Sequence, residues 1–203
     1  MDYQTDYIVT TITKQYYVKY MLRQLACYDS YTLQHSVDVA KESLSFGEYL
    51  GLRKEELLKL AYAGILHDVG KIMIPTNIIL KTARLSELEY AQVKMHPIMG
   101  ANLIRKTDFF SEDAISGVLF HHENYDGSGY PYGKKEDEIS MYGQILRITD
   151  SYDALIDNRP YRNGLTELEA LEIIESGIGK EYSPDLCEKF ILHKNNIDKR
   201  KIW

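Results

Sequence analysis

Apolar residues recur at helical spacing along almost the whole chain. One segment carries Leu57, Leu58, Leu60, Ala61 and Ile65, and residues 145–155 repeat the pattern. Because residues three and four apart share one face of a helix, this spacing produces amphipathic helices that pack apolar face to apolar face. The sequence therefore predicts an all-α fold.

We expect the helices to be separated by short connections and two longer loops. The predicted helices span residues 4–27, 32–49, 53–69, 86–106, 112–122, 140–157, 166–176 and 184–194, and the longer loops span 70–85 and 123–139. Capping-box patterns begin at Ser86 and Thr166, where a hydroxyl and a following glutamate can satisfy free backbone N–H groups. Ser183 before Pro184 indicates a third helix start.

The chain is long enough for one substantial core, at 203 residues of which 44% are hydrophobic. No repeat or linker divides it. We expect a single helical domain over residues 31–203, with residues 1–30 as an N-terminal helical extension packed on it. The N-terminal stretch is rich in tyrosine, at Tyr3, Tyr7, Tyr16, Tyr17, Tyr20, Tyr28 and Tyr31. Such rings pack a helix on its domain or against a partner subunit, so a homodimer is one of the two alternatives.

Charge and hydropathy exclude several classes of protein. A net charge of −6 argues against a broad nucleic-acid interface, which needs a basic face. No run approaches the ~18 apolar residues of a membrane span, and the first residues lack a signal-peptide pattern. Cys27 and Cys187 are far apart and form no disulfide framework. We therefore expect a cytoplasmic protein without a DNA, RNA or membrane partner.

Two short runs place residues able to bind metal side by side. They begin at His67-Asp68 and at His121-His122, in a chain with 6 histidines. Neutral imidazole and carboxylate together suit iron, manganese or zinc. Successive helical side chains diverge by about 100°, so His67 and Asp68 can bind one ion each, or Asp68 can bridge two ions ~3.5–4 Å apart. The runs indicate a metallohydrolase, with Asp68 as the candidate bridge.

Further ligands must come from other helices. The candidates are His35, His96 and Asp150. A single histidine on an apolar face is more often a hydrogen-bonded core residue, but their joint recurrence favours a metal site. Asp150 lies among apolar residues, where a carboxylate is costly to bury without a cation. Asp153 and Asp157 are better explained as residues that support the site or pair with arginines at the helix end.

The quoted runs, taken in order, resemble the HD-GYP domains, a branch of the HD metal-dependent phosphohydrolase superfamily. The likeness extends from about Thr32 to Leu192. It is carried by His67-Asp68-x-Gly70-Lys71, Lys94-Met95-His96-Pro97, His121-His122-Glu123-x-x-Asp126-Gly127-x-Gly129-Tyr130-Pro131, Asp150-Ser151-Tyr152-Asp153-Ala154-Leu155 and Arg159-Pro160-Tyr161-Arg162. The fold expected is then a single-domain HD-type helical bundle with a Gly-Tyr-Pro loop.

The resemblance implies a site with two or three iron or manganese ions that hydrolyses cyclic di-GMP, a bacterial second messenger, to linear pGpG and in some members on to GMP. By position, the implied metal ligands are His35, His67, Asp68, His96, His121, His122 and Asp150. Lys71 matches the lysine beside the substrate phosphate, Tyr130 the tyrosine of the loop, and Arg159 and Arg162 the arginines near the dinucleotide phosphates. In this scheme Asp68 and Lys71 are the catalytic residues, and a hydroxide shared by the metals attacks phosphorus.

The chain departs from its relatives at one position that affects the metals. Trimetallic members have a glutamate one turn before the first histidine, where this chain has Tyr31, so we predict two ions. Tyr125 and residues 81–84 are smaller departures that leave the ligands intact. For Lys71 and the arginines, the alternative is pairing with nearby acidic residues such as Glu123.

Two other functions stay open from sequence. The chain can be a receptor that binds a cyclic dinucleotide without efficient turnover and reports to a protein partner through the Gly-Tyr-Pro loop, where an exposed Tyr130 could stack on a base or touch that partner. It can also be an HD hydrolase of another nucleotide or phosphate ester. The Gly-Tyr-Pro loop itself can be either a wall of the pocket or only a structural turn.

Overall fold

The computed structural model describes residues 3–28, 30–158 and 163–200, and the side chains of residues 5–27, 31–158 and 163–197. The longer helices are α1 (Tyr3–Thr13), α2 (Tyr16–Tyr28), α3 (Ser30–Tyr49), α4 (Lys54–Leu66), α7 (His96–Arg105), α8 (Glu112–Phe120), α9 (Met141–Ile156), α10 (Glu167–Ser176) and α11 (Pro184–Arg200). Shorter segments are α5 (Thr76–Ile79), α6 (Glu87–Val93) and the 3-10 turns η1 (Val69–Met73) and η2 (Glu136–Glu138). No strand occurs among the described residues, which confirms the all-α prediction.

Two predicted helices are each divided into two. The predicted helix 4–27 breaks between α1 and α2, where Thr11 Oγ1 donates to the carbonyl of Tyr7 at 2.8 Å and Thr13 Oγ1 to that of Thr10 at 3.0 Å. Hydroxyls that occupy backbone carbonyls compete with helix continuation. The predicted helix 86–106 breaks between α6 and α7 because Pro97 has no N–H for the carbonyl of Val93.

Other boundaries differ by less, or lie in predicted loops. α4 ends at Leu66 and passes into η1, and α11 continues to Arg200, past the predicted end at 194. The predicted loop 70–85 contains most of η1 and all of α5. The capping boxes are confirmed: the Ser86 and Thr166 hydroxyls accept the N–H of the residue three positions later.

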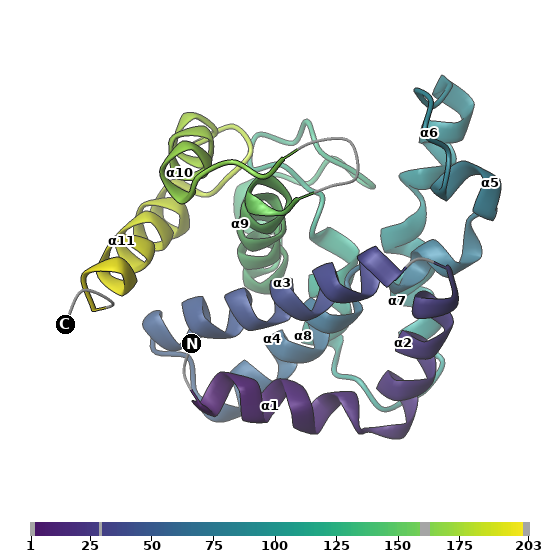
Figure 1. Cartoon of the computed structure of the whole chain (residues 1–203), viewed down its shortest axis with the longest axis horizontal. Helices are drawn as coiled ribbons and strands as arrows, with labels where there is room; N and C mark the ends of the chain where they lie inside the picture. The colour runs from purple at the N-terminus through teal and green to yellow at the C-terminus, as the bar shows by residue number, and fades with distance from the viewer. Residues whose placement is uncertain (1–2, 29, 159–162, 201–203) are drawn as a thin grey trace.

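The core consists of two apolar clusters that share α3 and α4. One cluster joins these helices to α1, α2, α7 and α8, and the other joins them to α8, α9, α10 and α11. α10 and α11 lie at the end of the molecule opposite α5 and α6 (Figure 1). α3 and α4 therefore link the two halves, and the elements that carry the histidines approach one another around them.

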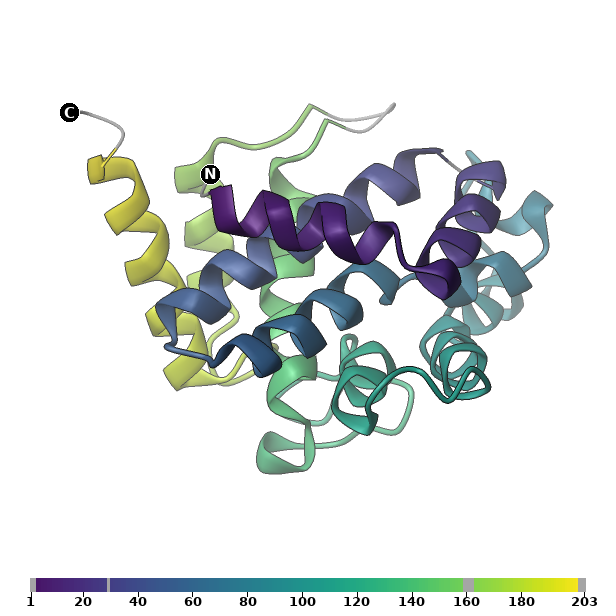
Figure 2. The same ribbon diagram turned by 90° about the horizontal axis from the view of Figure 1, so that it is seen from below.

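The N-terminal helices pack mainly through aliphatic side chains, with Tyr17 also in contact with Phe109. Val9, Ile12 and Val18 are buried in the first cluster, and α1 lies alongside α3 and α4 (Figure 2). Tyr7 and Tyr16 are 63% and 76% exposed. A homodimer through these rings and a division of the chain at residue 30 remain predictions. Within the described residues, no helix is both long and apolar enough to span a bilayer.

Candidate metal centre

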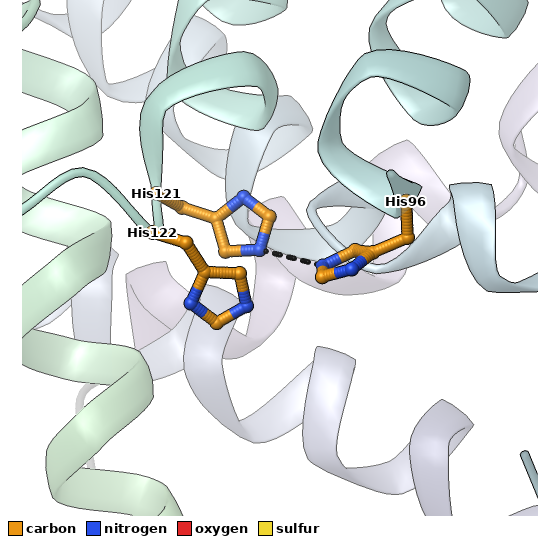
Figure 3. A group of neighbouring side chains, drawn as sticks. All are labelled: His96, His121 and His122. Atoms are coloured by element: carbon orange, nitrogen blue, oxygen red, sulfur yellow. Dashed lines mark hydrogen bonds between the residues drawn. The ribbon is translucent and has the colours of Figure 1, made fainter. Parts of the chain in front are cut away.

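The predicted ligands converge from α3, α7 and α9 and from the C-terminal ends of α4 and α8. Their donor atoms form three overlapping groups, within each of which all atoms lie within 4.8 Å of one another. The groups are His35 with His67 and Asp150, His67 with Asp68 and His121, and His96 with His121 and His122. Figure 3 shows the last group, where the two histidines after α8 face His96 of α7. The structure thus brings together every ligand predicted from sequence.

Helix ends set the orientation of three of these imidazoles. His67 Nδ1 donates to the carbonyl of Gly64 at 2.8 Å, His96 Nδ1 to that of Val93 at 2.8 Å, and His121 Nδ1 to that of Val118 at 2.7 Å. The carbonyls of Gly64 and Val118 are available because their helices end within the next turn. The carbonyl of Val93 is available because Pro97, four residues later, has no N–H to donate. Since a carbonyl only accepts, each Nδ1 carries the proton and each Nε2 presents a lone pair to the centre.

Gly70 allows the two halves of the centre to approach. A side-chain carbon at this position would lie 2.0 Å from the carbonyl oxygen of His96 and 2.5 Å from the backbone nitrogen of Gly100. Only glycine fits such a backbone contact. The glycine of the His-Asp-x-Gly-Lys motif therefore lets η1 lie against α7, which brings Asp68 close to His96.

Asp68 lies between the histidine groups. Its Oδ1 is 3.3 Å from His96 Nε2, its Oδ2 is 3.5 Å from His67 Nε2, and the same Oδ2 accepts from Lys71 Nζ. Burial alone would raise the pKa of the Asp68 carboxyl, but Lys71 and the neighbouring imidazoles hold this pKa well below its ordinary value. Asp68 is therefore an anion with one oxygen toward each group, which is the arrangement a bridging ligand needs.

His35 is oriented by a carboxylate in place of a carbonyl. Its Nδ1 lies 2.7 Å from Asp153 Oδ2 and its Nε2 lies 3.0 Å from Asp150 Oδ1. Burial would raise the pKa of Asp150, but its contacts with His35 hold this pKa well below the ordinary value. Asp153 thus supports the site through His35, one of the two sequence explanations. Arginine pairing is the other, and Arg159 and Arg162 lie outside the described residues.

The Nε2 lone pairs of His96 and His121 face each other, and a cation would relieve their repulsion. His96 Nε2 and His121 Nε2 are 3.2 Å apart (Figure 3) although the Nδ1 of each ring is already the donor to a carbonyl. His67 Nε2 is buried and has no hydrogen-bond partner among the described residues. Burial lowers the pKa of His67 and holds the pKa of His121 and His122 well below the usual range, so these rings stay neutral near pH 7. Neutral imidazoles and ionised carboxylates are the donor set of a metal site.

The Gly-Tyr-Pro loop is fastened to the end of α8. The buried Glu123 accepts from the backbone N–H of Tyr132 at 2.7 Å and of Lys134 at 3.1 Å. A side-chain carbon at Gly129 would lie 2.1 Å from the backbone nitrogen of Asn124, so the loop folds back closely on itself. Glu123 is therefore occupied by the loop and does not pair with Lys71.

Tyr130 packs against the candidate ligand His122 and is not fully exposed to solvent. Its ring stacks on His122, with centroids 4.7 Å apart and an interplanar angle of 29°, and its side chain is half-buried. An exposed Tyr130 was one of the alternatives left open from sequence, and the half-buried ring does not match it. The exposed ring of the loop is Tyr132, at 59%. A protein partner at this loop remains a prediction, and Tyr132 would be the ring it meets.

A cavity of about 360 Å³ opens onto the centre. Its lining includes His35, Asp68, His122 and Asp150, and its cations among the described residues are Lys71 and Arg147. Sequence analysis anticipated Lys71 but not Arg147. A charged residue inside the apolar run 145–149, one helical turn before Asp150, was the signal that could have identified it.

The amino-acid sequence of the chain is similar to those of known HD-domain proteins. A family model described as HD domain covers residues 19–186. A cyclic di-GMP phosphodiesterase of Thermotoga maritima is 36% identical over 170 residues, which are 83% of this chain and 46% of the relative. A 3'3'-cGAMP-specific phosphodiesterase of Vibrio cholerae is 33% identical over 156 residues, which are 76% of this chain and 34% of the relative. The chain spans less than half the length of these relatives.

Solved structures give the same assignment. An HD-GYP-type protein, written HDG"Y"P, from Bdellovibrio bacteriovorus superposes with a TM-score of 0.65 at 25% identity over 82% of this chain and 52% of its own. The HD domain of an L. monocytogenes phosphodiesterase shares the fold, with a TM-score of 0.61 at 20% identity over 87% of this chain and 98% of its own. The chain belongs to the HD domain family, in the HD-GYP branch that its motifs indicated.

Proposed function

We propose that the chain is a metal-dependent phosphodiesterase that hydrolyses a cyclic dinucleotide, with cyclic di-GMP cut to linear pGpG as its first reaction. One observation carries the proposal. Asp68 faces histidine groups on both sides and also pairs with Lys71, at the edge of a cavity open to a substrate. The names of the relatives support the choice of a cyclic dinucleotide.

Two divalent ions fit the donor set, which contains imidazole and carboxylate and no thiolate. One ion would be held by His35, His67, Asp68 and Asp150, and the other by Asp68, His96, His121 and His122. Iron and manganese suit such ligands. When bound, the pair supplies Lewis acidity and water of lowered pKa for attack on phosphorus. Tyr31, whose ring is stacked on that of His35, adds no carboxylate for a third ion.

Lys71 supplies positive charge where the phosphoryl oxygens gain negative charge. Its ammonium donates a hydrogen bond to the carboxylate of Asp68, and this contact supports a role at the reacting phosphate instead of at a distant part of the substrate. A charge fixed before the reaction lowers the barrier without reorganisation. Tyr130 stacks on the ring of His122 and would support this ligand from outside the cavity. Release of GMP from pGpG would be a second, slower step at the same centre.

The test is anaerobic purification with metal analysis, followed by an assay that separates the products of cyclic di-GMP by chromatography. We expect two metals per chain and sustained release of pGpG. A parallel panel contains a mixed GMP–AMP ring, mononucleotides and nucleotide polyphosphates. Full metal occupancy with binding but no turnover would favour the receptor function. A mononucleotide or polyphosphate with the highest kcat/KM would favour another HD hydrolase.

A further inference from the structure

Arg147 lines the same cavity but stands outside the metal centre. It lies on α9 one helical turn before Asp150, so both side chains face the same region. Lys71 reaches the cavity from η1 and donates a hydrogen bond to Asp68. The two cations therefore enter from different elements, and of these two Lys71 is the one that contacts a metal-centre carboxylate within the described part of the chain.

The guanidinium of Arg147 is held in one orientation by three contacts. Nε donates to Asn124 Oδ1 at 3.0 Å, Nη1 to Ser151 Oγ at 2.5 Å and Nη2 to Glu181 Oε2 at 2.9 Å. The ring of Tyr182 lies beneath it, 5.3 Å from the central carbon. A guanidinium fixed in this way loses little freedom when it binds an anion.

Part of its donor capacity remains for a ligand. A guanidinium has five N–H groups, and the contacts with described residues use one on each of its nitrogens. One N–H on Nη1 and one on Nη2 therefore have no partner among the described residues, and a phosphate can accept from donors of this kind. The side chain of Glu181 is 38% exposed and that of Arg147 is 16% exposed, so solvent screens this ion pair at its outer end.

We propose that Arg147 binds the second, non-scissile phosphate of the cyclic dinucleotide and thereby favours substrates with two phosphates over simple phosphodiesters. This inference rests on the proposed function. On the proposed function, Lys71 contacts the phosphate that reacts, because it is hydrogen-bonded to Asp68 of the metal centre. Arg147 is one turn removed from the metal centre and provides the matching contact for the phosphate across the ring.

The alternative is that Arg147 only ties α9 to the Gly-Tyr-Pro loop through Asn124 and to the turn before α11 through Glu181. A structural role would affect every substrate alike. A phosphate-binding role affects only a substrate that has the second phosphate. The two roles are separated by comparing cyclic di-GMP with bis(p-nitrophenyl) phosphate, a diester with a single phosphate.

The experiment measures kcat and KM of metal-loaded Arg147→Gln and Arg147→Lys proteins on both substrates. For Arg147→Gln on cyclic di-GMP we expect KM to rise about tenfold or more with little change in kcat, since one charge-assisted contact is lost. On bis(p-nitrophenyl) phosphate we expect kcat/KM to stay within about twofold. Arg147→Lys should recover part of the affinity, because it retains the charge.

Glu181→Gln is the matched control. It removes the carboxylate that ties Arg147 down but leaves the positive charge in the cavity. On the proposal, its KM for cyclic di-GMP is unchanged or lower. A Glu181→Gln protein as impaired as Arg147→Gln, or an equal loss on both substrates in Arg147→Gln, would show a structural role and overturn the inference.

Calorimetric binding of cyclic di-GMP to the metal-loaded protein gives the same test without turnover. Affinity about tenfold weaker in Arg147→Gln supports the inference, and equal affinity overturns it. If the wild-type protein binds but does not cleave, the proposed function fails while the role of Arg147 is still decided by this comparison.

Discussion

His96 and His121 direct their Nε2 atoms at each other across 3.2 Å, while the Nδ1 of each ring donates to the backbone carbonyl three residues earlier in the chain. Two buried lone pairs in that position repel each other unless a cation lies between or beside them. The metal is therefore expected to stabilise the fold as well as to serve the chemistry.

Removal of metal should lower the melting temperature. At a metal concentration about one hundred times its Kd, binding adds about 2.7 kcal/mol to the free energy of unfolding. For a domain of this size that corresponds to roughly 5–10 °C. Differential scanning calorimetry before and after chelation, and again after manganese is restored, measures the shift. Identical melting temperatures in all three samples would contradict a cation at these histidines.

Asp68→Asn should remove metal and activity together. The substitution keeps the shape of the side chain but loses the charge between His67 and His96. We expect metal content to fall below one ion per chain and kcat/KM to fall at least about 100-fold. Asp113→Asn is the control, because Asp113 pairs with Lys59 at the surface. A variant that keeps two metals would show that Asp68 is not the bridge.

Lys71→Ala should separate metal binding from chemistry. The lysine contacts Asp68 but is not itself a ligand, so we expect the metal content to be retained and kcat to fall about 10²–10³-fold. Metal analysis and steady-state kinetics on the same preparation measure both quantities. Lys81→Ala serves as control, since Lys81 pairs only with the Glu89 carboxylate among the described residues. A wild-type kcat in Lys71→Ala would remove the catalytic role.

The course of the helices was predictable where a local signal marks the boundary. Ser86 and Thr166 cap helices as their patterns indicate, because a cap depends on residues within one turn. The break near Thr13 was not predictable in the same way. Threonine occurs inside many helices, and only the structure shows that its hydroxyl occupies a carbonyl here. The break before Pro97 did carry a signal, since proline in a helical pattern kinks or ends it.

The clustering of the candidate ligands could be predicted because the adjacent pairs His67-Asp68 and His121-His122 are rare patterns in sequence. Their supporting contacts could not. The carbonyl of Gly64 that orients His67 belongs to the backbone, which every residue has. For Lys71 the sequence left two alternatives, a role beside a phosphate and an ion pair with Glu123. In the structure Glu123 accepts from the backbone of the loop, and Lys71 donates to Asp68 instead. Such choices depend on which charged groups the fold brings together, and no local pattern encodes them.

Glu123→Gln should loosen the Gly-Tyr-Pro loop without emptying the metal centre. The carboxylate accepts two backbone N–H groups, and an amide can accept only through its one oxygen. We expect a loss of about 1–3 kcal/mol in the free energy of unfolding, with metal content retained. Urea unfolding measures the loss. The control is Glu138→Gln, since Glu138 lies at an exposed site and, within the described ranges, accepts a hydrogen bond from the backbone of Lys135 alone. Equal stabilities of the two variants would contradict the anchoring role.

The pH dependence of the metal-free protein should be governed by His35. Burial lowers the pKa of this imidazole, but hydrogen bonds to Asp150 and Asp153 outweigh burial and raise the pKa from 6.5 to about 10. A pKa raised on folding contributes stability that is complete below the unfolded value and is lost as pH rises through the folded value. The contribution of His35 is thus present at pH 6 and disappears toward pH 10.

We expect the free energy of unfolding of the metal-free wild type, relative to His35→Gln, to fall by a few kcal/mol between pH 6 and pH 10. Urea unfolding in chelator at several pH values measures this difference. His193→Gln is the control, because His193 contacts Ser45 outside the metal centre. A difference between wild type and His35→Gln that does not change with pH would show that His35 does not hold the proton. In metal-loaded protein the cation replaces that proton, so metal affinity should instead rise with pH over the same interval.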